Sequence, residues 1–151
     1  MKFLTDRPDI TAPKTVEQYN QLKNLLSALN QKQLTPDIIA LIDREIDHIN
    51  YANDTGKKLE KSVKAAENQI IKAVEKELKI VPRNYYKKLW TAFGFTAFGL
   101  PIGVSIGLLL KNIGLLALGL PIGMVIGFLV GSKLDKKAAE EGRQLDFEVK
   151  L

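Results

Sequence analysis

The sequence predicts an all-α integral membrane protein, in which a cytoplasmic helical hairpin or bundle precedes an antiparallel, glycine-rich hairpin of two transmembrane helices. Two long apolar stretches, residues 89–110 and 113–131, contain no charged side chain. Apolar side chains upstream of them recur at helical spacing, and basic residues gather where the apolar stretches meet the rest of the chain. The mean hydropathy of the whole chain lies near zero because these stretches are averaged with highly charged ones.

Residues 1–15 are predicted to form a mobile leader. Pro8 and Pro13 stand among charged and polar residues that show no apolar periodicity. The leader also lacks the apolar core of a secretory signal, so we expect the residues before the first apolar stretch to stay in the cytoplasm.

Residues 16–81 are predicted to form three amphipathic helices of a cytoplasmic region. The first ends near Asn30, the second begins after Thr35, whose side chain caps it, and the third covers about residues 58–80. Because their apolar stripes are narrow, we expect this region to associate with copies of itself or with a cytoplasmic partner. The predicted buried faces are Val16, Tyr19, Leu22, Leu25, Leu26 and Leu29; Ile38, Ile39, Ile42, Ile46 and Ile49; and Leu59, Val63, Ala66, Ile70, Val74 (or Ala73) and Leu78 (or Glu77).

Residues 82–132 are predicted to form the transmembrane hairpin, with spans at about 89–110 and 113–131. At 1.5 Å per residue the spans reach roughly 33 and 28 Å, close to the roughly 30 Å of a bilayer core. The polar connection Lys111-Asn112 is so short that the two helices must run antiparallel. Fully buried helices of a soluble protein are the alternative, but the rest of the chain is too small and too polar to cover them. Residues 133–151 are predicted to be a cytoplasmic tail.

The basic flanks predict that both termini lie in the cytoplasm and that the protein is a multi-pass protein of the inner (plasma) membrane. Six basic residues flank the outer ends of the spans, whereas Lys111 alone lies in the connection. Tyr85, Tyr86 and Trp90 are predicted to anchor the start of the first span at the interface. The six flanking residues are Arg83, Lys87, Lys88, Lys133, Lys136 and Lys137.

The two spans contain an internal repeat. The sequence Gly-Leu-Pro-Ile-Gly occurs at residues 99–103 and again at 119–123, an offset of 20 residues. Pro101 and Pro121 each remove a backbone hydrogen bond, so a hinge is predicted at each proline. Counting away from the turn places Gly103 level with Gly119, and Gly99 level with Gly123.

Glycines spaced by four residues give each span a face without side chains. Such faces let helix backbones touch, and close packing over small residues is what associates helices in lipid. The glycines predicted to pack helices are Gly99, Gly103, Gly107, Gly119, Gly123, Gly127 and Gly131.

With these ladders, the stretch from Pro82 to Asp146 resembles glycine-zipper membrane proteins, and also a group of small bacterial membrane proteins with two transmembrane helices. The resemblance covers about 65 residues. It implies helix packing and homo-oligomers in a bacterial inner membrane, and it supplies no activity and no catalytic residue.

An enzyme is not predicted, and we assign no catalytic, metal-binding or cofactor-binding residue. The chain has no cysteine, and its single histidine, His48, has no histidine or cysteine partner for catalysis or metal binding. The glycines lie inside apolar helices, so they form no phosphate loop. Basic residues alternate with acids at helical spacing, which does not indicate nucleic-acid binding.

Two functions remain open. In the first, hairpins assemble through their glycine faces into a pore or channel in the lipid bilayer, with the cytoplasmic helices controlling assembly. In the second, the hairpin is an anchor or accessory scaffold subunit of a larger membrane complex, and the cytoplasmic helices recruit a protein partner.

Overall fold

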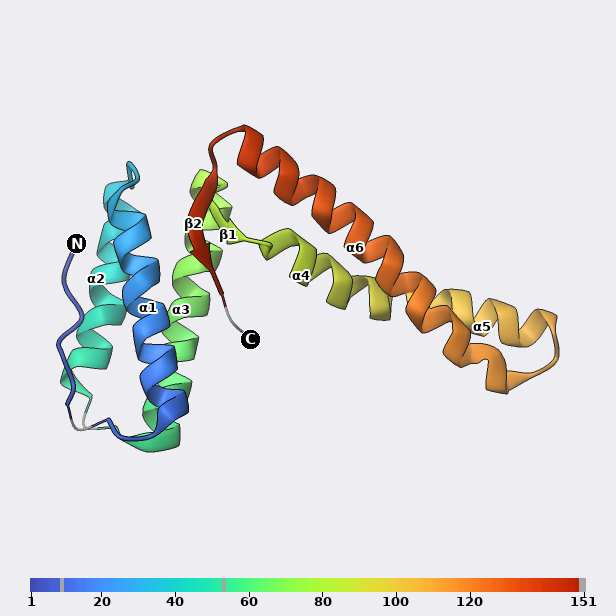
Figure 1. The fold of residues 1–151 in the computed structure, drawn as a ribbon, viewed down its shortest axis with the longest axis horizontal. Helices are drawn as coiled ribbons and strands as arrows, with labels where there is room; N and C mark the ends of the chain where they lie inside the picture. Colours follow the sequence, from blue (N-terminus) through green and yellow to red (C-terminus); the bar gives the residue numbers. More distant parts are fainter. Residues whose placement is uncertain (9, 53, 150–151) are drawn as a thin grey trace. The chain divides into compact units, whose positions relative to one another are not determined.

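The computed structural model describes residues 1–8, 10–52 and 54–149 (Figure 1). The chain divides into two compact units. Met1–Pro82 together with Leu145–Leu151 form the first, here called the helical unit, and Arg83–Gln144 form the second, the hairpin unit. Each unit is described by itself.

Three helices make up most of the helical unit: α1 (Pro13–Asn30), α2 (Pro36–Tyr51) and α3 (Gly56–Leu78). As predicted, the Thr35 hydroxyl accepts a hydrogen bond from the backbone N–H of Ile38, 3.4 Å away, and so caps α2. The predicted apolar faces of the three helices are largely buried, although Val16 is exposed and Ile39 and Leu78 are partly exposed. The 3.6-residue period therefore identified most of the core side chains of these helices.

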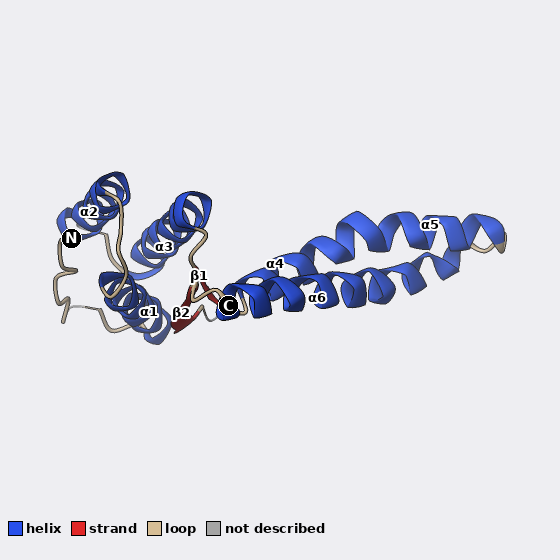
Figure 2. Cartoon of the chain, turned by 90° about the horizontal axis from the view of Figure 1, so that it is seen from above, coloured by secondary structure: helices blue, strands red, loops and turns tan. Residues whose placement is uncertain are grey.

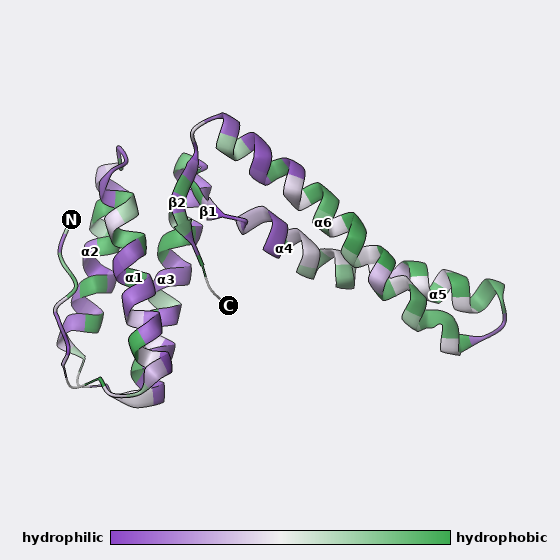
Figure 3. Ribbon diagram, viewed as in Figure 1, coloured by the Kyte–Doolittle hydropathy of each residue, from purple (hydrophilic) through white to green (hydrophobic). Residues whose placement is uncertain are grey.

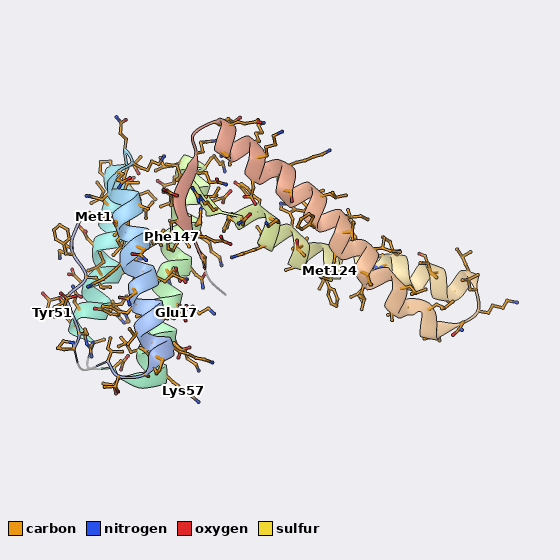
Figure 4. The ribbon with its side chains drawn as sticks, in the orientation of Figure 1. Met1, Glu17, Tyr51, Lys57, Met124 and Phe147 are labelled. Carbon is orange, nitrogen blue, oxygen red and sulfur yellow. The ribbon has the colours of Figure 1, made fainter. Side chains whose placement is uncertain are left out.

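The chain is mostly helical, as predicted, but it also contains a small sheet. Strand β1 (Val81–Arg83) pairs with strand β2 (Gln144–Glu148), which is marked with Phe147 in Figure 4. In β2, apolar and polar residues alternate, so Leu145 and Phe147 turn inward and are 2% and 9% exposed.

Most of residues 133–149, which lie within the predicted cytoplasmic tail 133–151, form regular structure. Helix continues to Glu140, and the strand that follows belongs to the helical unit. The narrow apolar stripes of α1, α2 and α3 are thus joined in the core by side chains from the C-terminal end of the same chain, Leu145 among them. Association of this region with copies of itself or with a partner stays a prediction.

The backbone of the predicted mobile leader forms hydrogen bonds with side chains of α1 and α2. The Asn50 side chain accepts from the Thr5 N–H at 3.0 Å and donates to the Phe3 carbonyl at 3.1 Å. Leu4 is 8% exposed, and Tyr19 donates its hydroxyl hydrogen to the Thr5 carbonyl. Asp9, which belongs to the leader, lies outside the described residues.

A buried polar pair joins α1 to α3. The Gln21 amide donates to the two carboxylate oxygens of Glu67 at 2.8 and 3.0 Å, and Glu67 is only 2% exposed. Burial raises the pKa of the Glu67 carboxyl, while the Gln21 hydrogen bond and the charge of Lys64 act in the opposite direction.

The hairpin unit consists of two antiparallel arms that lie side by side in Figure 2. The first arm comprises α4 (Tyr85–Gly94), the π-helical turn η1 (Phe95–Gly99) and α5 (Leu100–Leu109). After the short 3-10 turn η2 (Ile113–Leu115), the second arm is α6 (Leu116–Glu140). Both arms are long and apolar enough to cross a membrane, with mean hydropathies of 1.8 and 2.5 in their most apolar segments.

The two repeated prolines have different surroundings. Pro101 is the second residue after the π-helical turn, and because it has no N–H, the preceding carbonyls cannot form a regular α-helical ladder there. Pro121 lies inside α6, which continues as an α-helix on both sides. Hinge motion at these positions stays a prediction.

The first prediction concerns the C-terminal strand. Replacing the buried Leu145 by Ala should lower the free energy of unfolding of the helical unit by about 2–5 kcal/mol, because it removes core contacts and leaves a cavity. Urea unfolding of the full chain in detergent, followed by circular dichroism, measures this. Asp146→Ala changes an exposed side chain of the same strand and should cost less than about 1 kcal/mol. Equal small effects of the two substitutions would show that the strand contributes nothing to the core.

The second prediction concerns Glu67. Because its folded-state pKa lies above the ordinary value of 4.5, the folded chain binds this proton more tightly than the unfolded chain. The contribution of Glu67 to stability is therefore greatest below pH 4.5 and is lost as the pH rises through the folded-state pKa. Glu67→Gln should remove this part of the pH dependence of urea unfolding, whereas Glu60→Gln, on the same helix, should leave it intact. Superimposable wild-type and Glu67→Gln profiles would contradict the assignment.

Candidate functional site: the glycine face of the hairpin

Glycines from both arms of the hairpin are buried between the arms. All seven glycines predicted to pack helices lie here, and Gly94 joins them. Large apolar side chains point the other way: Leu108, Val125 and Leu129 are 70%, 58% and 55% exposed. The hairpin thus has its small residues inside and its bulky residues outside.

The backbones of the two arms are in direct contact in the middle of the hairpin. A Cβ atom added to Gly119 would lie 2.2 Å from the Gly103 nitrogen and 2.3 Å from the Gly99 oxygen. One added to Gly123 would lie 2.3 Å from the Gly94 oxygen and 2.4 Å from the Gly99 nitrogen. These contacts include the two pairs that counting from the turn predicts, and no side chain larger than hydrogen fits there.

The contact continues towards the base of the hairpin, where the chain enters and leaves it. A Cβ on Gly127 would lie 2.0 Å from the Trp90 carbonyl oxygen, and one on Gly131 would lie 2.4 Å from that of Tyr86. Near the turn the arms separate: a Cβ on Gly107 would meet its nearest atom, the Asn112 oxygen, at an ordinary 3.4 Å. Gly107 is therefore the member of the ladders with room for a methyl group.

The π-helical turn explains why the sequence analysis missed Gly94. Gly94 precedes Gly99 by five residues, so it falls outside a four-residue spacing. The wider turn between them brings Gly94 onto the same face, where a Cβ on Gly127 would lie 3.1 Å from its Cα. Counting from the turn would have found it, because that count places Gly94 almost level with Gly127.

Asp135 closes the base of the hairpin, and the sequence analysis missed it as well. Its two carboxylate oxygens accept hydrogen bonds from the backbone N–H groups of Tyr86, at 3.1 Å, and Lys87, at 2.8 Å. These groups begin α4 and lack partners within the helix, and a negative charge is favourable at a helix N-terminus. Asp135 is 7% exposed, so the second arm caps the first.

The predicted interface anchors lie in the first two turns of α4. The rings of Tyr85 and Tyr86 meet edge to face at 5.3 Å, and those of Trp90 and Phe93 meet in the same way at 6.3 Å. All three predicted anchors are partly exposed.

The hydroxyl groups of the hairpin bond to their own helices. Thr91 donates to the Lys87 carbonyl at 2.6 Å, and Ser105 donates to the Pro101 carbonyl at 2.8 Å. Thr96 bonds in the same way to Phe93. These hydroxyls satisfy backbone carbonyls instead of lining a polar path.

The helical unit carries a groove of about 890 Å³ between α1 and β2. Its lining is mostly amide, hydroxyl and carboxylate side chains. His48 lies elsewhere, exposed on α2, and the described part of the chain holds no group of three or more His, Asp or Glu side chains placed to bind a metal ion. The groove is lined by Pro13, Val16, Glu17, Asn20, Gln21, Asn24, Ser27, Ala28, Gln31, Asp146, Phe147 and Glu148.

Comparison with known proteins finds no matching protein family, no matching curated protein and no matching solved structure. The resemblance to glycine-zipper proteins therefore stays a prediction from the sequence.

The third prediction separates packing within one hairpin from packing between hairpins. Gly103→Ala and Gly119→Ala should each destabilise the hairpin by about 1–3 kcal/mol, because the added methyl group would meet backbone atoms. Gly107→Ala should be neutral or stabilise by up to about 1 kcal/mol, because space is present and Ala favours helix. Unfolding in mixed micelles, followed by the fluorescence of Trp90, measures the difference. Similar losses at all three positions would indicate that Gly107 also packs tightly, as it would against a second copy.

Proposed function

We propose that the chain is a non-enzymatic, multi-pass inner-membrane protein in which the hairpin unit is a two-helix anchor and the helical unit is a cytoplasmic scaffold that recruits a protein partner. The single observation that carries the proposal is the distribution of side-chain size in the hairpin, with glycines between the arms and bulky apolar side chains outside.

This distribution is the reverse of what a soluble helix pair requires. In water, helices associate by burying their large apolar side chains. Here only 22% and 17% of the most apolar segments of the two arms is buried, and Met124, labelled in Figure 4, is 40% exposed. Such a surface is an aggregation hazard in water, whereas in lipid it needs no cover. The bilayer is therefore the environment that fits this hairpin.

The proposed orientation places both termini and the helical unit in the cytoplasm. Six basic residues flank the base of the hairpin, and Lys111 lies at its turn. Strands β1 and β2, which precede and follow the hairpin along the chain, are hydrogen-bonded neighbours. A chain that leaves and returns to the same sheet must cross a bilayer an even number of times.

An anchor is favoured over a pore because the glycines of each arm already pack against the backbone of the other arm of the same hairpin. Assembly of hairpins through these faces would require the two arms of one hairpin to separate. The hydroxyls of Thr91, Thr96 and Ser105 are bonded to their own helices, which leaves the outer surface without a polar stripe to face an ion path. A pore-forming homo-oligomer stays a prediction that the experiment below tests.

The groove between α1 and β2 is the proposed place of recruitment. It has both a helix wall and a strand wall, and its polar lining suits a partner surface or peptide that forms hydrogen bonds. Because β2 follows the hairpin in the chain, a scaffold of this kind carries its binding surface close in sequence to its anchor.

The fourth prediction tests integration and topology. The chain contains no cysteine, so single cysteines at Lys2, Lys111 and Lys136 can be labelled selectively. In intact cells, a membrane-impermeant maleimide should label Lys111→Cys only, and the other two should react only after the membrane is permeabilised. Labelling of Lys2→Cys from outside would contradict the orientation, and release of the protein by alkaline washing would contradict the anchor.

The fifth prediction separates an anchor from a pore. The purified protein in detergent should be monomeric or bound to a partner, and in a planar bilayer it should give no conductance above that of protein-free membrane. Gly103→Ala serves as a matched variant, since a pore held by glycine faces would lose its conductance on this substitution. Steady channel openings that disappear in the variant would overturn the anchor in favour of the pore.

A further inference from the structure

Basic residues form a collar around the base of the hairpin, where α4 begins and α6 turns from apolar to polar (Figure 3). Asp135 bonds the first amides of α4, and Gly131 packs against Tyr86, so the basic residues of the two arms come to one end of the unit. The basic collar consists of Arg83, Lys87, Lys88, Lys133, Lys136 and Lys137.

The acid in the middle of the collar, Asp135, carries one negative charge against the six positive charges of the collar. The carboxylate of Asp135 is buried and bonded to two backbone N–H groups. Lys136 and Lys137 lie 3.8 and 3.9 Å from Glu140 and Glu141, and 79% and 68% of their side chains is exposed. Exposed ion pairs of this kind are weak, so the ammonium groups remain available to anions.

The collar lies at the border between apolar and polar surface. The Lys87 ammonium group is 5.8 Å from the centre of the Phe128 ring, and Phe128 is an exposed member of the apolar surface. Trp90, one turn after Tyr86, marks the same border with an amphipathic ring. An anion that meets both the lysines and this border must itself lie at the edge of an apolar phase.

We propose that the basic collar binds the phosphate groups of anionic phospholipids and so selects these lipids around the base of the hairpin. The inference rests on the proposed membrane anchor and names its lipid partner. Lipid headgroup phosphates lie at the boundary of the hydrocarbon core, which is the level of the collar. Each basic side chain near an anionic surface contributes up to about a fivefold preference, and the collar has six.

The single tryptophan of the chain provides the readout. The full-length protein is reconstituted in vesicles in which either phosphatidylglycerol or phosphatidylcholine carries brominated acyl chains, and quenching of Trp90 reports the lipid at the collar. We expect phosphatidylglycerol to be enriched about two- to fivefold next to Trp90. The variant K133Q/K136Q/K137Q removes half of the basic residues of the collar and should clearly lower this enrichment while circular dichroism shows unchanged helix.

A matched variant, K57Q/K61Q/K72Q, removes the same charge from exposed positions of α3 and should leave the enrichment unchanged. Equal loss in both variants would overturn the collar in favour of a general charge effect. Inorganic phosphate added at constant ionic strength should have no effect, and loss of enrichment would identify free phosphate as the ligand and overturn the lipid assignment. Equal quenching by the two lipids would overturn the inference but leave the anchor intact, whereas no quenching by either would overturn the anchor as well.

Discussion

Contact between the backbones of two glycine faces is the interaction on which the hairpin depends. In lipid, helices gain nothing by burying apolar side chains against each other, so close packing must supply the attraction. Six of the buried glycines, from Gly94 to Gly131, would bring an added Cβ within 2.4 Å of the opposite arm, and Gly99 lies on the backbone that two of these Cβ atoms would meet. The cost of so many glycines in helices, about 1 kcal/mol each relative to alanine, is offset only if these contacts form. Because glycines occupy the surface between the arms, the bulky side chains lie on the outer surface of the hairpin.

The order of the chain links the two units. The helical unit begins with α1, α2 and α3, but it is completed by β2, which follows the whole hairpin. The buried Leu145 and Phe147 therefore reach the core only after the hairpin has been made. Asp135 at the base of the hairpin fixes the alignment of the two arms shortly before this strand begins. The helical unit thus receives its last core residues from a segment that follows the whole hairpin unit in the chain.

Local periodicity in the sequence predicted the helices and their buried faces. It could not predict contacts between residues that are far apart in the chain. The faces around Leu22, Ile42 and Ile70 follow the 3.6-residue period, and Thr35 is a local cap, so the sequence identified them. Strand β2 alternates over only a few residues, and its partner lies 60 residues away, so its pattern was too short to recognise. Asp135 acts on amides of the other arm, and the leader docks through backbone groups, neither of which leaves a periodic signal. Gly94 was not predicted because the π-helical turn places it five residues before Gly99, outside the four-residue spacing of the other glycines.

The most direct test of the glycine contact is solid-state nuclear magnetic resonance of the full chain in bilayers, with ¹³C in the glycine α-carbons. Protein labelled in this way is diluted with unlabelled protein, so that only contacts within one chain keep their intensity. Because Gly103 and Gly119 of one chain are in contact, we expect their cross-peak to persist at full relative intensity on dilution. A cross-peak that disappears on dilution would show that the glycine faces join separate copies, and its absence before dilution would show that they do not meet at all.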